Sequence, residues 1–194
     1  DREAGDLTPL WPVDLARAAI EAAHAEGARV TAHCFDEVSV AQLVDAGIDG
    51  IEHGTGLDDA TIATMAERGV ALVPTLFNIE TFPGIAAAAD GKFPRYAAHM
   101  RALHARRFAT VGKALDAGVP IYAGTDAGAT LPHGLLASEI ELPAALPADG
   151  VEVHGLISDF VSLADLRIAG QRADASAAVI TVGADAMNGR MADG

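Results

Sequence analysis

The sequence contains little positive charge. Its 13 Lys and Arg residues stand against 27 Asp and Glu residues, which gives a formal net charge of -14. The phosphates of a nucleic acid would repel such a chain, because nucleic-acid binding depends largely on neutralising phosphates with Lys and Arg. Nucleic acid is therefore excluded as an expected partner.

The sequence also lacks a disulfide framework and a long hydrophobic run. Cys34 is the single cysteine, so no intrachain disulfide can form. No stretch approaches the roughly 18 uninterrupted apolar residues of a membrane helix, and the acidic start at residues 1–3 is unlike the basic start of a signal peptide. These absences favour a cytoplasmic protein with no membrane partner.

Aromatic residues are scarce as well, at 5% of the chain, whereas hydrophobic residues make up 51%. Such a composition excludes a disordered chain and indicates Ala-rich helices around a tight core. The 194 residues have the length of one ordinary domain but are few for a large barrel enzyme. Because the chain also has no initiator methionine, we expect it to be a piece of a longer protein.

Segments typical of helices and strands alternate along most of the sequence. This alternation predicts a parallel sheet with right-handed crossovers, as in a barrel or a doubly wound fold. Residues 77–94 contain two prolines and two glycines, so they are expected to form a long irregular connection. The expected helices cover residues 13–26, 39–46, 59–68, 96–117 and 135–142, and the expected strands cover 29–34, 48–53, 70–76 and 120–126.

Three polar residues lie at the ends of three of the expected strands: His33, His53 and Asp126. The carboxyl ends of parallel strands converge on one face, where catalytic groups and metals are commonly held. Two imidazoles and a carboxylate are suitable ligands for zinc or another first-row metal. Two other interpretations stay open: each histidine could be satisfied by loop backbone, or the pair could perform acid–base chemistry without a metal.

The motifs around these residues resemble one family. The runs Val-Thr-Ala-His at 30–33, Gly-Ile-Glu-His-Gly-Thr at 50–55 and Ala-Gly-Thr-Asp-Ala-Gly at 123–128 resemble the amidohydrolase superfamily, specifically its imidazolonepropionase-like and prolidase-like branch. The resemblance implies an α/β fold of the TIM-type (β/α)8 barrel kind, with these motifs ending strands five, six and eight. Residues 70–75 look like strand seven, whose following loop shapes the substrate pocket.

The resemblance also implies roles for individual residues. His33, His53 and Asp126 would bind a divalent metal, expected to be Zn²⁺, and Asp126 would act as general base toward the attacking water. His133, in the loop after Asp126, is the candidate for substrate binding, with capping of the following helix as the alternative. Cys34 and Glu52 neighbour the two histidines in sequence, so strand alternation places them on the opposite, helix-facing side.

Two elements of the family pattern are missing. The chain has no His-X-His pair of strand one and no strand-four lysine. Since residues 1–12 resemble the loop that leaves strand four, we expect strands five to eight only, with residues 1–147 as a partial barrel and 148–194 as an unassigned segment. The open edges of such a half-barrel favour self-association as a homo-oligomer.

The expected function is hydrolysis of carbon–nitrogen bonds in small amide, cyclic amide or dipeptide substrates by metal-activated water. This reaction class follows from the resemblance, whereas the residues alone indicate only a metal and a base. The alternative is a catalytically inactive half-barrel fragment or interaction module. Without the His-X-His pair and the lysine, the remaining ligands would bind a metal weakly or not at all. We expect the isolated chain to have little or no hydrolase activity without the missing half of the barrel.

Overall fold

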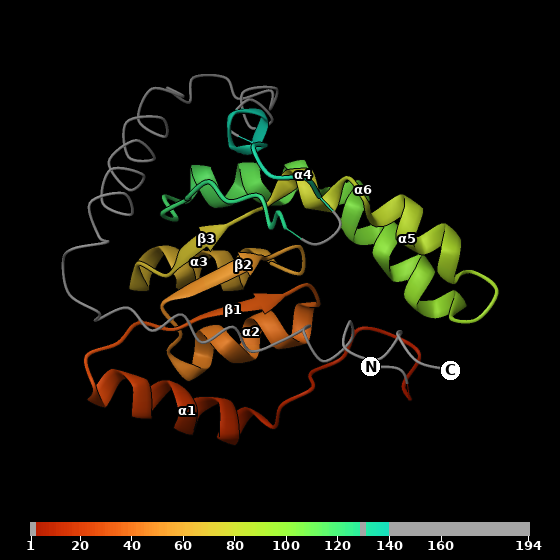
Figure 1. Ribbon diagram of the computed structural model, residues 1–194. Coiled ribbons are helices and arrows are strands. Elements are labelled where there is room, and N and C mark those ends of the chain that lie inside the picture. Colours follow the sequence, from red (N-terminus) through yellow and green to blue (C-terminus); the bar gives the residue numbers. More distant parts are fainter. Residues whose placement is uncertain (1–2, 129–130, 140–194) are drawn as a thin grey trace.

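The computed structural model describes residues 3–128 and 131–139, and these residues form an α/β fold (Figure 1). The expected segment 148–194 and the last part of the expected helix at 135–142 lie outside them. The expected alternation of helices and strands is confirmed. In chain order the elements are α1 (Val13–Ala25), β1 (Thr31–Cys34), α2 (Glu37–Ala46), β2 (Gly50–His53), α3 (Asp59–Arg68), β3 (Ala71–Val73), α4 (Leu76–Ile79), α5 (Phe82–Ala89) and α6 (Pro94–Asp116).

The three strands form a parallel sheet in the order β1-β2-β3. Beyond β3, the segment around Ile121 adds a fourth chain segment to the sheet, because Ile121 forms an isolated parallel bridge with Leu72. The expected strand at 120–126 is therefore wrong beyond this bridge. The left-handed backbone of Asp126 (φ 50°) interrupts the extended conformation that a ladder requires. The result is an open sheet whose neighbours follow chain order, as repeated βα units require.

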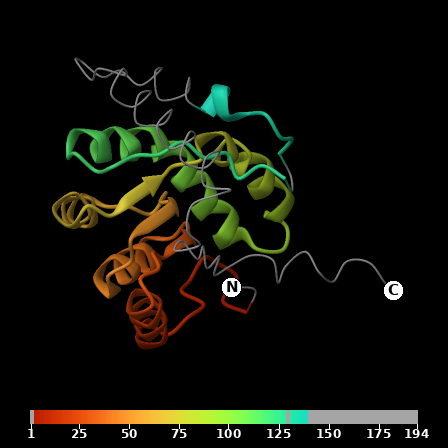
Figure 2. The same ribbon diagram turned by 60° about the vertical axis from the view of Figure 1, so that its left-hand side comes forward.

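The helices α1, α2, α3 and α6 pack side by side and cover one face of this sheet (Figure 2). Side chains on that face are buried, among them Ala32, Ile51 and Leu72. The helix at 39–46 begins earlier than expected, at Glu37, because the Asp36 carboxylate accepts hydrogen bonds from the backbone N–H groups of the first turn. No helix of the described residues is both long and apolar enough to cross a membrane.

The irregular connection expected at 77–94 is wrong, because the structure contains α4 and α5 in this region. Pro83 lies in the first turn of α5, where its missing N–H costs no helical hydrogen bond. The alanines at 86–89 then continue the helix, since alanine has the highest helix propensity. α5 packs along α6, and the two helices project beyond the sheet (Figure 1).

A charged cluster joins the first residues of the chain to α2 and α6. His99 on α6 lies between two carboxylates, with its Nδ1 2.9 Å from Asp6 and its Nε2 3.0 Å from Glu37. Arg106 on α6 donates a second hydrogen bond to Glu37, at 2.5 Å. Partial burial alone would lower the pKa of His99, but the two hydrogen bonds and the two negative charges together raise it above its usual value.

We expect His99→Gln to reduce stability more at mildly acidic pH than at alkaline pH. A raised pKa means that the folded state favours the protonated ring. The stabilisation is therefore complete below the unfolded pKa of about 6.5 and is lost as pH rises through the higher folded pKa. Urea unfolding of both proteins at about pH 5.5 and about pH 8.5 measures this difference. Ala98→Gln on the same helix is the control, and a difference that grew with pH would contradict the prediction.

Candidate functional site

The two candidate histidines meet at the carboxyl ends of β1 and β2. His53 Nε2 lies 2.6 Å from His33 Nδ1, which is a direct hydrogen bond between the rings. The ring centroids are 4.4 Å apart and nearly perpendicular. Phe35 packs against both rings, with centroid distances of 4.4 Å and 4.6 Å. Each histidine thus presents one ring nitrogen to the same point.

A left-handed backbone at His53 makes this contact possible. His33 and Cys34 alternate along β1, and Cys34 is buried on the helix-facing side. Regular alternation on β2 would turn His53 to that side as well, since its in-register neighbour is Cys34. The φ of His53 is 70°, a conformation uncommon outside glycine, so its ring points toward His33 instead.

The turn after His53 holds the two strand ends together. The backbone N–H of Gly54 donates to the carbonyl of Cys34 at 3.1 Å. The Thr55 hydroxyl donates to the carbonyl of Phe35 at 2.8 Å. Gly56 lies directly against the backbone of Asp36, where a Cβ atom would come within 2.3 Å of the carbonyl carbon. The Gly-Thr-Gly sequence is therefore fitted to the loop after β1.

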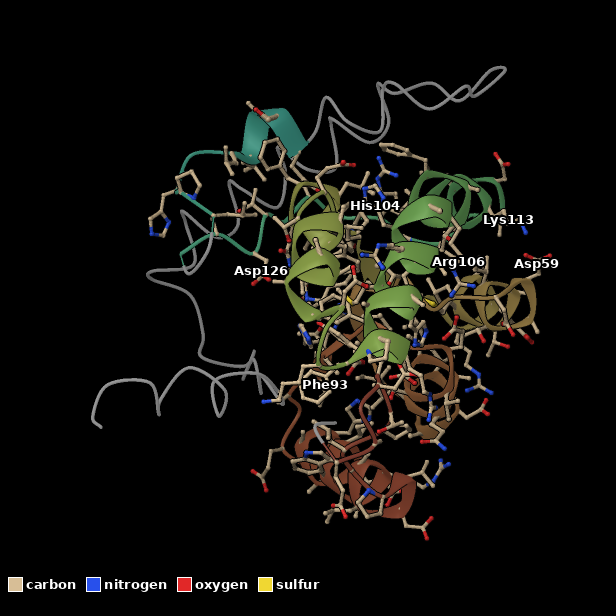
Figure 3. The ribbon with its side chains drawn as sticks, turned by 90° about the vertical axis from the view of Figure 1, so that its right-hand side faces the viewer. Asp59, Phe93, His104, Arg106, Lys113 and Asp126 are labelled. Carbon is tan, nitrogen blue, oxygen red and sulfur yellow. The ribbon has the colours of Figure 1, made fainter. Side chains whose placement is uncertain are left out.

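Asp126 lies in the segment that follows Ile121, the residue that forms a bridge with β3. Its charge acts on His33, and its Oδ2 accepts a hydrogen bond of 2.8 Å from Asn78 Nδ2 on α4. The carboxylate is exposed and also has a left-handed backbone, with φ 50°. Figure 3 shows Asp126 at the opposite side of the molecule from the ion pair of Asp59 and Lys113.

Burial controls the charge of both rings. It lowers the pKa of His33, and the nearby negative charge of Asp126 partly opposes this change. Burial lowers the pKa of His53 well below its usual value, and the adjacent His33 lowers it further. Both shifts favour the uncharged imidazole, which is the form that binds a metal ion or accepts a proton.

A third strand-end residue, Thr75, completes the arrangement around His53. Its hydroxyl lies 2.5 Å from His53 Nδ1, and it is buried, with φ 46°. Thr75 lies near the end of the strand expected at 70–76 and two residues after β3 ends at Val73, so the reasoning that selected the other strand-end residues could have selected it. Asn78 and Glu139 carried no such signal, because the first fell in a segment expected to be irregular and the second in a helix beyond the loop.

The remaining sequence candidates lie around this centre. His133 is exposed and lies near Gly128, two residues after Asp126, where a Cβ atom would come 3.3 Å from the His133 ring. Cys34 is buried and faces the helices, as expected. The helix-facing orientation expected for Glu52 is wrong. Glu52 is in register with His33 and accepts a hydrogen bond of 3.0 Å from the Thr31 hydroxyl, which places it on the same face as His33.

The described residues do not contain a preformed metal cage. Among residues 3–128 and 131–139, no group of three or more His, Cys, Asp or Glu side chains lies close enough to hold a metal ion. His33 and His53 contact each other directly, while Asp126 is hydrogen-bonded to Asn78. Rotation of the rings is therefore needed before both facing nitrogens could bind one ion.

We expect Thr75→Val to destabilise the fold by about 1–3 kcal/mol, because it leaves the buried Nδ1 of His53 without its hydrogen-bond partner. Urea unfolding measures the loss. Thr64→Val is the matched control: the Thr64 hydroxyl donates to a backbone carbonyl on the exposed side of α3, so its change should stay within about 0.5 kcal/mol. Equal effects of the two substitutions would contradict the importance of the Thr75 contact.

Comparison with known sequences gives a consistent pattern. The model of the amidohydrolase family matches residues 9–163. An uncharacterized protein of Mycobacterium tuberculosis and another of Mycobacterium bovis are each 60% identical over 154 residues, or 79% of this chain. Those residues are 40% of each relative, so the chain spans well under half the length of the curated relatives that it matches.

Solved structures give a similar result. A Xaa-Pro dipeptidase with bound methionine in its active site is 27% identical, with a TM-score of 0.66, and the match covers 82% of this chain and 38% of that one. A putative prolidase from Bifidobacterium longum is 28% identical, with a TM-score of 0.61, and the match covers 73% of this chain and 37% of that one. The A. niger ochratoxinase is 26% identical, with a TM-score of 0.58, and the match covers 70% of this chain and 30% of that one.

Proposed function

Because the chain belongs to the amidohydrolase family, we propose that it carries part of the active site of a metal-dependent hydrolase that cleaves carbon–nitrogen bonds. The observation that carries the proposal is the contact between His33 and His53. The two imidazoles direct one nitrogen each to a common point at the carboxyl ends of adjacent parallel strands. Asp126 lies near enough to act on His33 electrostatically.

The chemistry of these side chains fits a divalent metal. His33 Nδ1, His53 Nε2 and the Asp126 carboxylate supply nitrogen and oxygen ligands of the kind that Zn²⁺ accepts in catalytic sites. The other ring nitrogen of His53 is hydrogen-bonded to Thr75, as is usual for histidine ligands, whose second nitrogen is normally held by a protein group. A bound metal would supply polarisation of the substrate carbonyl and would favour deprotonation of a water molecule.

The residues of the chain perform the proton transfer. Asp126 would accept the proton of the attacking water as general base, since its carboxylate is exposed at the site and able to reach solvent. The amide of Asn78 orients this carboxylate through one oxygen and leaves the other oxygen available. His133, near the loop that follows Asp126, would contact the substrate.

Small amides and dipeptides are the proposed substrates. The similar structures include proteins named as a Xaa-Pro dipeptidase and a putative prolidase. We infer from these names only the class of bond, an amide within a small molecule. Because the chain matches under half the length of its relatives, the activity belongs to the complete barrel.

One observation favours a second candidate. The direct hydrogen bond of 2.6 Å between the rings lets His33 and His53 share a proton, which suits acid–base chemistry without a metal. An inactive fragment or interaction module is the third possibility. Metal dependence of the hydrolysis separates the metal-dependent enzyme from the acid–base enzyme. The absence of any hydrolysis identifies the inactive fragment or interaction module.

The experiment compares this chain with a chimera in which it is joined to the parts of the M. tuberculosis relative that the match leaves out. Both are assayed with dipeptides, N-acyl amino acids and lactams, with Zn²⁺ or after chelation. We expect hydrolysis by the chimera with Zn²⁺ only and little by the chain alone. Equal rates after chelation would favour the acid–base candidate, and a folded chimera that is inactive on the whole panel would contradict a hydrolase.

A further inference from the structure

The short helix α4 connects two members of the candidate site. Thr75, directly before α4, is hydrogen-bonded to His53, and Asn78 within α4 donates to Asp126. These contacts join residues from the ends of different strands. The position of α4 therefore determines how His53 and Asp126 lie relative to each other.

The beginning of α4 lacks a cap from its own sequence. A threonine at this position usually accepts hydrogen bonds from the first N–H groups of the helix. The Thr75 hydroxyl makes no such bond, because the residue has a left-handed backbone rather than the extended one typical of a cap and its hydroxyl is turned toward His53. The N–H groups of Leu76 and Phe77 consequently require another acceptor, since the helix start is buried.

Glu139 supplies that acceptor from more than sixty residues along the chain. Its Oε1 accepts from Leu76 N at 2.5 Å and its Oε2 accepts from Phe77 N at 2.8 Å. The residue is only 2% exposed. Burial raises the pKa of this carboxyl, although the two amide hydrogen bonds partly oppose the rise. Both oxygens of this buried carboxyl group are used by backbone N–H groups, and no ion pair of the described residues involves it.

We propose that Glu139 is a positioning residue for the candidate site. Its carboxylate takes over the capping of α4 and so frees the Thr75 hydroxyl to hold His53. The same cap fixes the turn that carries Asn78 and thereby orients Asp126. The hydrogen bonds of Glu139 within the described residues go to the first turn of α4 and not to His53 or Asp126, so it acts through α4. The catalytic consequence rests on the proposed function, whereas the geometric consequence does not.

The first test measures His53 directly. The ¹⁵N signals of its two ring nitrogens are recorded in the metal-free, full 194-residue chain at neutral pH and assigned with His53→Gln. We expect Glu139→Ala to move these signals toward the positions found in Thr75→Val, because Thr75 then turns to cap α4. Wild-type His53 signals in folded Glu139→Ala would overturn the proposal.

The matched control is Asp58→Ala. Asp58 caps α3 by accepting a hydrogen bond of 2.8 Å from Thr61 N, and none of the hydrogen bonds within the described residues joins that cap to the site. This variant also loses a helix cap but should leave the His53 signals unchanged. An equal shift in Asp58→Ala would show a general loss of structure and would overturn the proposal.

Glu139→Gln keeps the shape and one acceptor oxygen, so it should fold even where Glu139→Ala does not. Its His53 signals should move in the same direction by a smaller amount, and unchanged signals would count against the proposal. In the chimera with Zn²⁺, Glu139→Ala should lower kcat roughly 10–100-fold with KM nearly constant. If the chimera proves inactive, the proposed function fails, while the ring signals still decide the role of Glu139.

Discussion

Asp126→Asn should lower the turnover of the zinc-loaded chimera by roughly 10²–10⁴-fold while leaving its fold intact. Asparagine has nearly the same shape as aspartate and still offers an oxygen to the amide of Asn78. It cannot accept the proton of the attacking water at neutral pH. The effect should therefore fall on kcat, with little change in the urea midpoint.

The control for Asp126→Asn removes a carboxylate that is far from the site. Asp59 is exposed and paired with Lys113 at 2.6 Å, on the opposite side of the molecule (Figure 3). Asp59→Asn removes the same charge, and its surface ion pair contributes about 0–1 kcal/mol, so turnover should stay near wild type. Undiminished turnover in Asp126→Asn would remove Asp126 from the mechanism.

Gly56→Ala should destabilise the fold by about 3 kcal/mol or more. The new Cβ atom would lie 2.3 Å from the backbone carbon of Asp36 and 2.5 Å from the nitrogen of Glu37. Both atoms belong to the backbone at the start of α2, so a side-chain rotation cannot relieve the contact. The turn after β2 must therefore move away from β1, which also separates His53 from His33.

Gly84→Ala is the matched control for this prediction. Gly84 lies in α5 with nothing within 4 Å of its Cβ position. Alanine there should stabilise the helix by about 0.5–1 kcal/mol. Urea unfolding of both variants provides the comparison. A Gly56→Ala protein as stable as wild type would show that this turn is not closely packed in solution.

The alternation of helices and strands could be predicted because it depends on local signals. Apolar residues at helical spacing located α1, α3 and α6 within a few residues. The errors lie where tertiary contacts decide the conformation. The sequence around α4 gives no signal for this helix, because its cap, Glu139, is distant in sequence. The region of α5 contains prolines and glycines, which favour a loop unless tertiary contacts decide otherwise.

The candidate site could be predicted in part for a similar reason. Strand ends of a parallel sheet share one edge, and this rule predicts that His33, His53 and Asp126 lie at the same edge. Strand alternation alone placed Glu52 on the wrong face. The left-handed backbone of His53 breaks that alternation, and a non-glycine residue gives no warning of such a conformation.

Zinc binding is the most direct test of the metal-dependent site. Isothermal titration of Zn²⁺ into the metal-free chimera is compared with the double variant His33→Gln/His53→Gln. His99→Gln serves as the control, since it removes a histidine that lies between carboxylates but outside the site. We predict one zinc-binding event that is lost in the double variant and retained in His99→Gln. Zinc binding that is unchanged in the double variant, or absent from the wild-type chimera, would contradict the account.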